Sequence, residues 1–119
     1  MKKESIIQKK SFDFAVKIYH LSRQLVVNRQ FSVADQLLRS GTSIGANVEE
    51  GHGGHSLKEF SHRISIAYKE ARETRYWLKL LRATGSLSSE QAETLITEAE
   101  ELCRMLGSAQ KTLRAKIES

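Results

Sequence analysis

Hydrophobic residues recur along the chain at spacings of three and four, separated by short polar segments, and this pattern predicts four helices. In the first, expected over about residues 5–28, Phe14, Ile18, Leu21 and Leu25 form one apolar stripe. No segment shows the strict alternation that is typical of a half-buried strand. Four helices with short connections predict an all-α fold, a single antiparallel up-down four-helix bundle domain spanning residues 1–119.

Serines and glycines mark where the other three helices are expected to begin and end. Ser32, Ser56 and Ser88 each precede an Asp, Glu or Gln by three residues, the spacing of a capping box or a close variant of it. The glycines of residues 51–54 are expected to end the second helix, because glycine takes the left-handed conformation common at helix C-termini. Gly85 is expected to end the third helix in the same region of the chain where the apolar pattern stops.

The second predicted helix contains a segment, RSGTSIGANVEEGHGGHS, that has few large side chains. A glycine inside a helix costs about 1 kcal/mol relative to alanine, so two glycines four residues apart indicate a close approach to the backbone. The approaching group is another helix, another subunit or a ligand. We expect Gly41 and Gly45 to contribute to an oligomer interface.

This segment also resembles a known family. Its core SIGANVEEG resembles the proteins encoded in intervening sequences of 23S ribosomal RNA genes, and the similarity extends from about Phe12 to the C-terminus. Further matching positions are Ser56, Glu59, Phe60, Ile66, Ala67, Glu70, Ala71, Glu73, Thr74, Tyr76, Trp77 and Leu78. The resemblance implies a small non-enzymatic helical bundle that assembles as a homopentamer. The related accessory proteins of diversity-generating retroelements are basic and implicated in nucleic-acid binding.

Composition places the chain among ordinary globular proteins, with 39% hydrophobic and 28% charged residues in a length of 119. Cys103 is the single cysteine, so an intramolecular disulfide is excluded and a reducing, cytoplasmic location is expected. The charged N-terminus has no apolar run behind it, so we expect neither a signal peptide nor membrane association.

Positive charge is concentrated in two parts of the chain. Net charge is +5 over residues 1–31, −2 over 32–54, +4 over 55–84 and −2 over 85–119. One interpretation is that neighbouring helices pair their opposite charges; the other is that basic faces bind the phosphates of RNA or DNA. For the second, the candidate residues are Lys2, Lys3, Lys9, Lys10 and Lys17 in the first helix and Lys69, Arg72, Arg75, Lys79 and Arg82 in the third.

Four polar residues are candidates for a cluster between the second and third helices, namely Asn47, Glu50, Glu70 and Glu73. Glu70 and Glu73 lie one turn apart and share a helix face. The cluster is interpreted as a structural network that pairs the carboxylates with Arg63, Arg72, Arg75 or Tyr68. A binding role and simple exposure to water are the alternatives.

The aromatic pair Tyr76 and Trp77 is expected at the edge of the bundle, because Trp77 adjoins the core residue Leu78 and cannot point into the same seam. Exposed aromatic side chains often mark an interface, so we expect a subunit contact there. Ordinary packing against a neighbouring helix is the alternative.

Two Glu-x-x-His spacings, at Glu49–His52 and Glu59–His62, resemble those of di-iron carboxylate bundles. The two motifs are only ten residues apart, and His52 stands among glycines that are expected to end a helix. We therefore expect no metal, no cofactor and no catalytic residues. The predicted function is a homo-oligomeric scaffold that binds RNA or DNA; the alternatives are a protein–protein interaction module with an unknown protein partner and a metal-binding bundle enzyme.

Overall fold

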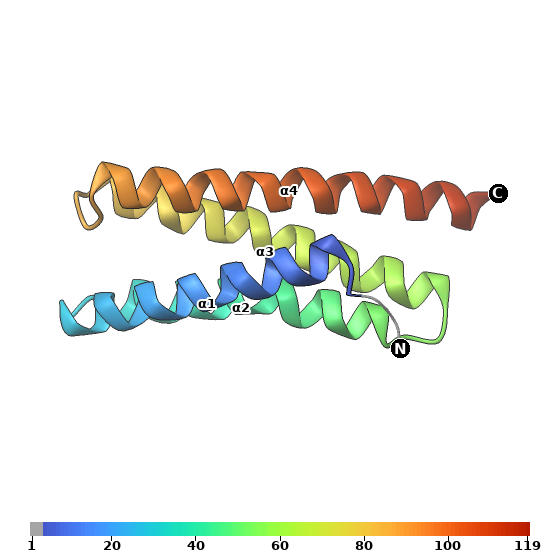
Figure 1. The fold of residues 1–119 in the computed structure, drawn as a ribbon, viewed down its shortest axis with the longest axis horizontal. Coiled ribbons are helices and arrows are strands. Elements are labelled where there is room, and N and C mark those ends of the chain that lie inside the picture. The colour runs from blue at the N-terminus through green and yellow to red at the C-terminus, as the bar shows by residue number, and fades with distance from the viewer. Residues whose placement is uncertain (1–3) are drawn as a thin grey trace.

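Four α-helices account for nearly all of the computed structural model, which describes residues 4–119 (Figure 1). The helices are α1 (Ile6–Val27), α2 (Phe31–His52), α3 (Leu57–Ala83) and α4 (Ser89–Glu118), and residues 4–119 contain no strand. Helices adjacent in sequence run antiparallel and pack extensively, whereas α1 and α4 share the smallest contact. The predicted all-α four-helix bundle is confirmed.

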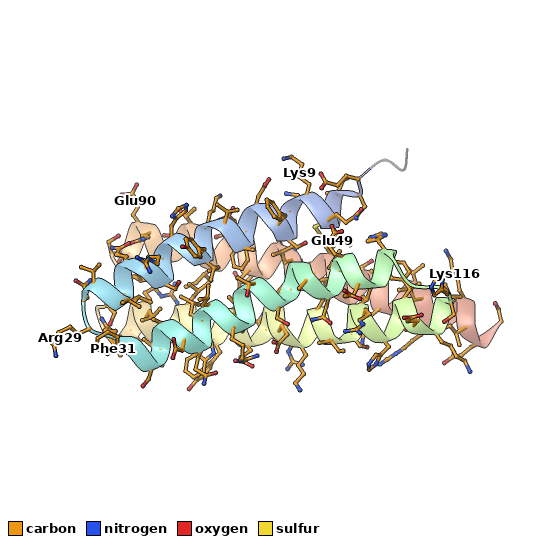
Figure 2. All side chains as sticks on the ribbon, turned by 90° about the horizontal axis from the view of Figure 1, so that it is seen from below. Lys9, Arg29, Phe31, Glu49, Glu90 and Lys116 are labelled. Carbon is orange, nitrogen blue, oxygen red and sulfur yellow. The ribbon has the colours of Figure 1, made fainter. Side chains whose placement is uncertain are left out.

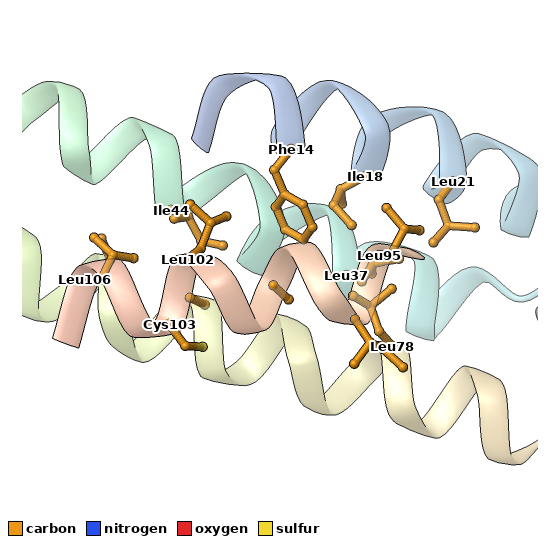
Figure 3. Packing of buried hydrophobic residues seen from close by; sticks show 14 of the residues in the cluster. Phe14, Ile18, Leu21, Leu37, Ile44, Leu78, Leu95, Leu102, Cys103 and Leu106 are labelled. Carbon is orange, nitrogen blue, oxygen red and sulfur yellow. The ribbon is translucent and has the colours of Figure 1, made fainter. Parts of the chain in front are cut away.

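The apolar stripe predicted for the first helix faces the core. Phe14, Ile18, Leu21 and Leu25 of α1 are at most 2% exposed, and Figure 3 shows Phe14, Ile18 and Leu21 pointing toward the other helices. Burial of each such side chain contributes about 1.5–3 kcal/mol to folding. None of the helices within residues 4–119 has an apolar stretch long enough to cross a bilayer.

Two of the three predicted serine caps are present. The hydroxyl of Ser56 accepts the amide N–H of Glu59, and that of Ser88 accepts the N–H of Gln91. The expected reciprocal contact is absent in both, because the Glu59 carboxylate accepts the N–H of His55 instead and the Gln91 side chain donates to Gln24. A complete capping box that the sequence reading missed occurs at the start of α1.

The prediction that Ser32 caps the second helix is wrong. Helix α2 already begins at Phe31, and its N-cap residue Gln30 makes no side-chain capping bond. The reason lies in the preceding turn, where Arg29 has a φ of 63° and the Gln30 N–H donates to the carbonyl of Leu25. This left-handed residue reverses the chain so tightly that Ser32 already lies within the first helical turn.

The second helix ends among the predicted glycines, at His52, but without the expected left-handed glycine, whereas Gly85 is left-handed. Gly53, the C-cap of α2, has a φ of −86°, so no left-handed glycine ends this helix. Gly51 lies inside α2, where an added Cβ would be 2.8 Å from the ring of Phe60 on α3, so its smallness permits close helix packing. Gly85 has a φ of 74° and follows the end of α3, as predicted.

Candidate functional site

The lysines predicted on the first helix are mostly engaged in ion pairs. Lys10 pairs with Glu101 of α4, and the Lys17 ammonium lies 2.5 Å from the Glu98 carboxylate of the same helix. Lys9 lies 3.2 Å from Asp13 within α1. The Lys10 contact lowers the pKa of the Glu101 carboxyl by hydrogen bonding and by its charge. For Lys10 and Lys17, the structure thus shows charge pairing between α1 and α4. The other two candidates, Lys2 and Lys3, lie outside the described residues.

The basic residues predicted on the third helix have a different environment. Arg72, Arg75, Lys79 and Arg82 are spaced by three, four and three residues, so they form one stripe along α3, which we call the α3 basic stripe. Arg75 is half-buried and the other three are exposed. None of the four forms an ion pair with any acid among residues 4–119. Lys69 is also exposed and precedes Arg72 by three residues, at the flank of the stripe.

The carboxylates of Glu70 and Glu73 meet at a single guanidinium. Arg39 of α2 donates to Glu70 over 2.7 Å and to Glu73. The indole N–H of Trp77 donates to Glu73 over 3.0 Å and, together with Arg39, holds the pKa of that carboxyl below its usual range. Glu70 is only 7% exposed, so this pairing satisfies a buried charge.

The other two residues of the predicted cluster lie apart from this pairing. Asn47 accepts a hydrogen bond from Arg63 and donates to Ser43, whereas Glu50 is exposed and makes no side-chain hydrogen bond within residues 4–119. No hydrogen bond in that range joins Asn47 or Glu50 to the two helix-α3 carboxylates.

Sequence reasoning missed Arg39 as the partner of these carboxylates. It is the only Lys or Arg between residues 32 and 54 and falls on the turn of α2 next to the buried Ser40, whose hydroxyl lies 2.9 Å from that of Thr74 on α3. The sequence did contain a signal for this pairing, because Arg39 is a lone basic residue in an acidic helix.

The two helix-α2 glycines are used for packing within the chain. An added Cβ at Gly41 would be 2.6 Å from Cγ2 of Ile18, and one at Gly45 would be 3.3 Å from the carbonyl oxygen of Ser11. Both contacts bring α2 close to α1. Gly41 is buried, whereas Gly45 is partly exposed. A role of either glycine in a subunit contact stays a prediction.

Tyr76 and Trp77 lie at the edge of the bundle. Tyr76 is 59% exposed, and its ring meets that of Trp77 edge to face at a centroid distance of 5.2 Å. Trp77 is half-buried and packs against the core. The exposed tyrosine is available to a partner, and its role in a subunit contact stays a prediction.

Helix α1 carries a second apolar stripe, which the sequence reading overlooked. Phe12, Val16 and Tyr19 are 65%, 42% and 49% exposed and are spaced by four and three residues on the side of α1 away from the core. We call these three residues the α1 apolar stripe. A shallow cavity of about 290 Å³ between α1 and α2 adjoins it and is lined in part by Phe12, Gly45 and Ala46. Figure 2 shows Glu49 of α2 facing α1, where its carboxylate accepts a hydrogen bond from the Gln8 side chain.

The histidine spacings do not produce a metal-binding geometry. Within residues 4–119, no three His, Cys, Asp or Glu side chains gather in a way that could hold a metal ion. The ring of His52 instead lies against that of Phe60 at a centroid distance of 5.0 Å, and its Nε2 is 3.4 Å from the Ser5 hydroxyl.

Comparisons with known proteins agree on one family. A model of the 23S rRNA-intervening sequence protein family matches residues 3–108. A crystal structure of a protein of unknown function from Bacteroides thetaiotaomicron VPI-5482, described as from the S23 ribosomal protein family, superimposes with a TM-score of 0.86. That protein is 41% identical over 89% of this chain and 99% of its own. No curated protein matches the chain.

Proposed function

Because this chain belongs to the 23S rRNA-intervening sequence protein family, we propose that it is a non-enzymatic, homo-oligomeric four-helix bundle that binds the phosphates of RNA or DNA. The α3 basic stripe carries the proposal. Its four cations project from one face of one helix and are not neutralised by any acid of residues 4–119. Such a row attracts a polyanion through backbone contacts that need no base recognition.

The oligomeric part of the proposal is supported by the α1 apolar stripe. Three large apolar side chains that lie exposed along one helix face are typical of an interaction surface. The family resemblance suggests five subunits. A ring would present the α3 basic stripe once per subunit, and repetition would raise the affinity of individually weak phosphate contacts.

The experiment is fluorescence anisotropy with a labelled structured RNA and a labelled duplex DNA over a salt series, on protein whose mass is measured by light scattering. We expect binding that weakens steeply with salt, because each neutralised phosphate releases counterions. Lys79→Glu with Arg82→Glu should abolish it. The matched control, Arg23→Glu with Lys116→Glu, makes the same charge change at exposed positions on α1 and α4 that have no ion pair within residues 4–119, and it should retain binding.

Absence of binding by the wild-type protein at low salt would refute the nucleic-acid part of the proposal. The alternative function, a protein-interaction module that uses the α1 apolar stripe, would then be favoured. The oligomer is tested separately with Phe12→Asp and Val16→Asp, which should reduce the mass to that of a monomer; a monomeric wild-type protein would refute it.

A further inference from the structure

We propose that the groove between α3 and α4 is the binding site for a single-stranded phosphodiester chain, with Arg104 and Lys111 of α4 as contacts in addition to the α3 basic stripe. This inference deepens the proposed function and rests on it. It names a strand type, a groove and two residues of α4 that the sequence reading left unassigned.

The groove has a volume of about 600 Å³ and lies on the outer side of the α3–α4 pair. Its lining combines three basic residues and one acidic residue with an aromatic ring and small residues. Gly107 is important to its shape, because an added Cβ there would lie 3.5 Å from the ring of Tyr68. The lining consists of Tyr68, Arg75, Glu100, Cys103, Arg104, Gly107, Ser108 and Lys111.

Charge in the groove is strongly unbalanced. Arg75, Arg104 and Lys111 line it, and the guanidinium of Arg72 stands at its rim, 5.7 Å from the ring centroid of Tyr68. None of these cations is in an ion pair with an acid in the described part of the chain. Glu100 is the one carboxylate in the lining, which leaves a net charge of +3 from four cations and one anion.

Cys103 lies in the lining of the groove, among these charges. Burial raises the pKa of the Cys103 thiol, the charges of Arg75 and Arg72 lower it, and the charge of Glu100 raises it. The two guanidinium groups therefore act on atoms at the bottom of the groove, where a bound phosphate would also feel them. The thiol stays neutral near pH 7 and does not compete with an anion.

The dimensions of the groove favour one strand over two. Neighbouring packed helices are about 8–10 Å apart, so the groove between them is narrow, and a duplex would rest across both helices without entering it. A positively charged groove with an aromatic side chain is the usual platform for single-stranded nucleic acid, since any base can stack on the ring. Here the Arg72 guanidinium lies over the ring of the half-buried Tyr68, so the exposed planar group available to a base is that guanidinium.

The α3 basic stripe extends the groove into a track. Since Tyr68 lies against Gly107 and the helices are antiparallel, Lys111 stands about one turn beyond Tyr68, near the level of residue 64. From there to Arg82 the track is about 27 Å long at 1.5 Å per residue. Several successive phosphates of one strand can lie along this length.

The test measures anisotropy of a labelled single-stranded RNA of mixed sequence, with the duplex of the same sequence as competitor, over a salt series. Removing two phosphate contacts from a single-strand complex should reduce the slope of log affinity against log salt by about 1.4. We expect this for Arg104→Gln with Lys111→Gln. The matched control, Arg23→Gln with Lys116→Gln, should keep the wild-type slope. Helix content and oligomer mass are compared for every variant.

Glu100→Gln gives a second, independent readout, because removing the one carboxylate in the lining should strengthen binding without loss of any contact. If the wild-type protein binds and the Arg104→Gln, Lys111→Gln variant has the same salt slope, the groove is not the binding site, while the proposed function stands. Equal competition by the duplex would overturn the choice of a single strand. No binding by the wild-type protein would overturn both.

Discussion

The contact between Gly41 and Ile18 gives the sharpest test of helix packing in this bundle. Replacing Gly41 with alanine places a Cβ 2.6 Å from Cγ2 and 3.0 Å from Cγ1 of Ile18. Ile18 is fully buried and β-branched, so it has little freedom to rotate away. Overpacking of this kind costs about 1–3 kcal/mol. Alanine regains about 1 kcal/mol of helix propensity, so we expect a net loss of about 1 kcal/mol.

Gly107→Ala is the matched control for this substitution. Gly107 also lies inside a helix, but the nearest atom to an added Cβ belongs to the ring of Tyr68 at 3.5 Å, an ordinary van der Waals distance. Only the propensity difference remains, and the variant should be more stable than wild type by about 1 kcal/mol. The same chemical change is thus expected to have opposite signs at the two glycines.

The measurement is urea denaturation followed by far-ultraviolet circular dichroism, at one protein concentration because oligomerisation is linked to stability. A further variant, Ile18→Ala, removes Cγ1 and Cγ2 and keeps only Cβ, which is 3.1 Å from the added Cβ, so Gly41→Ala should cost less in that background than in the wild-type protein. The reasoning is refuted if Gly41→Ala stabilises the wild-type protein as much as Gly107→Ala does.

Other predictions concern the charges between α2 and α3. Arg39→Gln leaves the buried Glu70 unpaired and should lower the free energy of unfolding by about 1–2 kcal/mol, a value reduced by the exposure of the arginine, whereas Arg82→Gln should change it little. Since the pKa of Glu73 is lowered in the folded state, its contribution is full above about pH 4.5 and is lost as pH falls through the folded pKa. Trp77→Phe removes the largest cause of that shift and should raise the Glu73 pKa measured by NMR titration; an unchanged value would contradict the assignment.

The course of the helices was predictable because local signals determine it. The core stripe of α1, the hydroxyl caps at Ser56 and Ser88 and the left-handed Gly85 all depend on residues within a few positions of one another. The predicted cap at Ser32 was wrong for a local reason too, but residue preferences do not indicate it. The left-handed residue in the turn is Arg29, a type that rarely adopts a positive φ.

The candidate site was less predictable because it depends on register between helices. The spacing of Glu70 and Glu73 identifies a shared face but does not say which helix supplies the cation, and Arg39 comes from a position more than thirty residues earlier. Lys10 and Lys17 were expected to face a ligand, yet the register of α1 against α4 places them beside Glu101 and Glu98. By contrast, the spacing of Phe12, Val16 and Tyr19 already indicated the α1 apolar stripe. It was missed because the core stripe alone was enough to predict the helix.

The unequal contacts between helices have a consequence for how the chain folds. Most contacts join helices that follow one another in sequence, so the contact order is low and folding is expected within microseconds to milliseconds. We expect the seam between α1 and α4 to close last, because contact is smallest there and Lys10 and Lys17 reach across it to Glu101 and Glu98. Screening by salt weakens such exposed pairs, so ionic strength sets how readily this seam reopens and how soon the amides along it exchange with solvent.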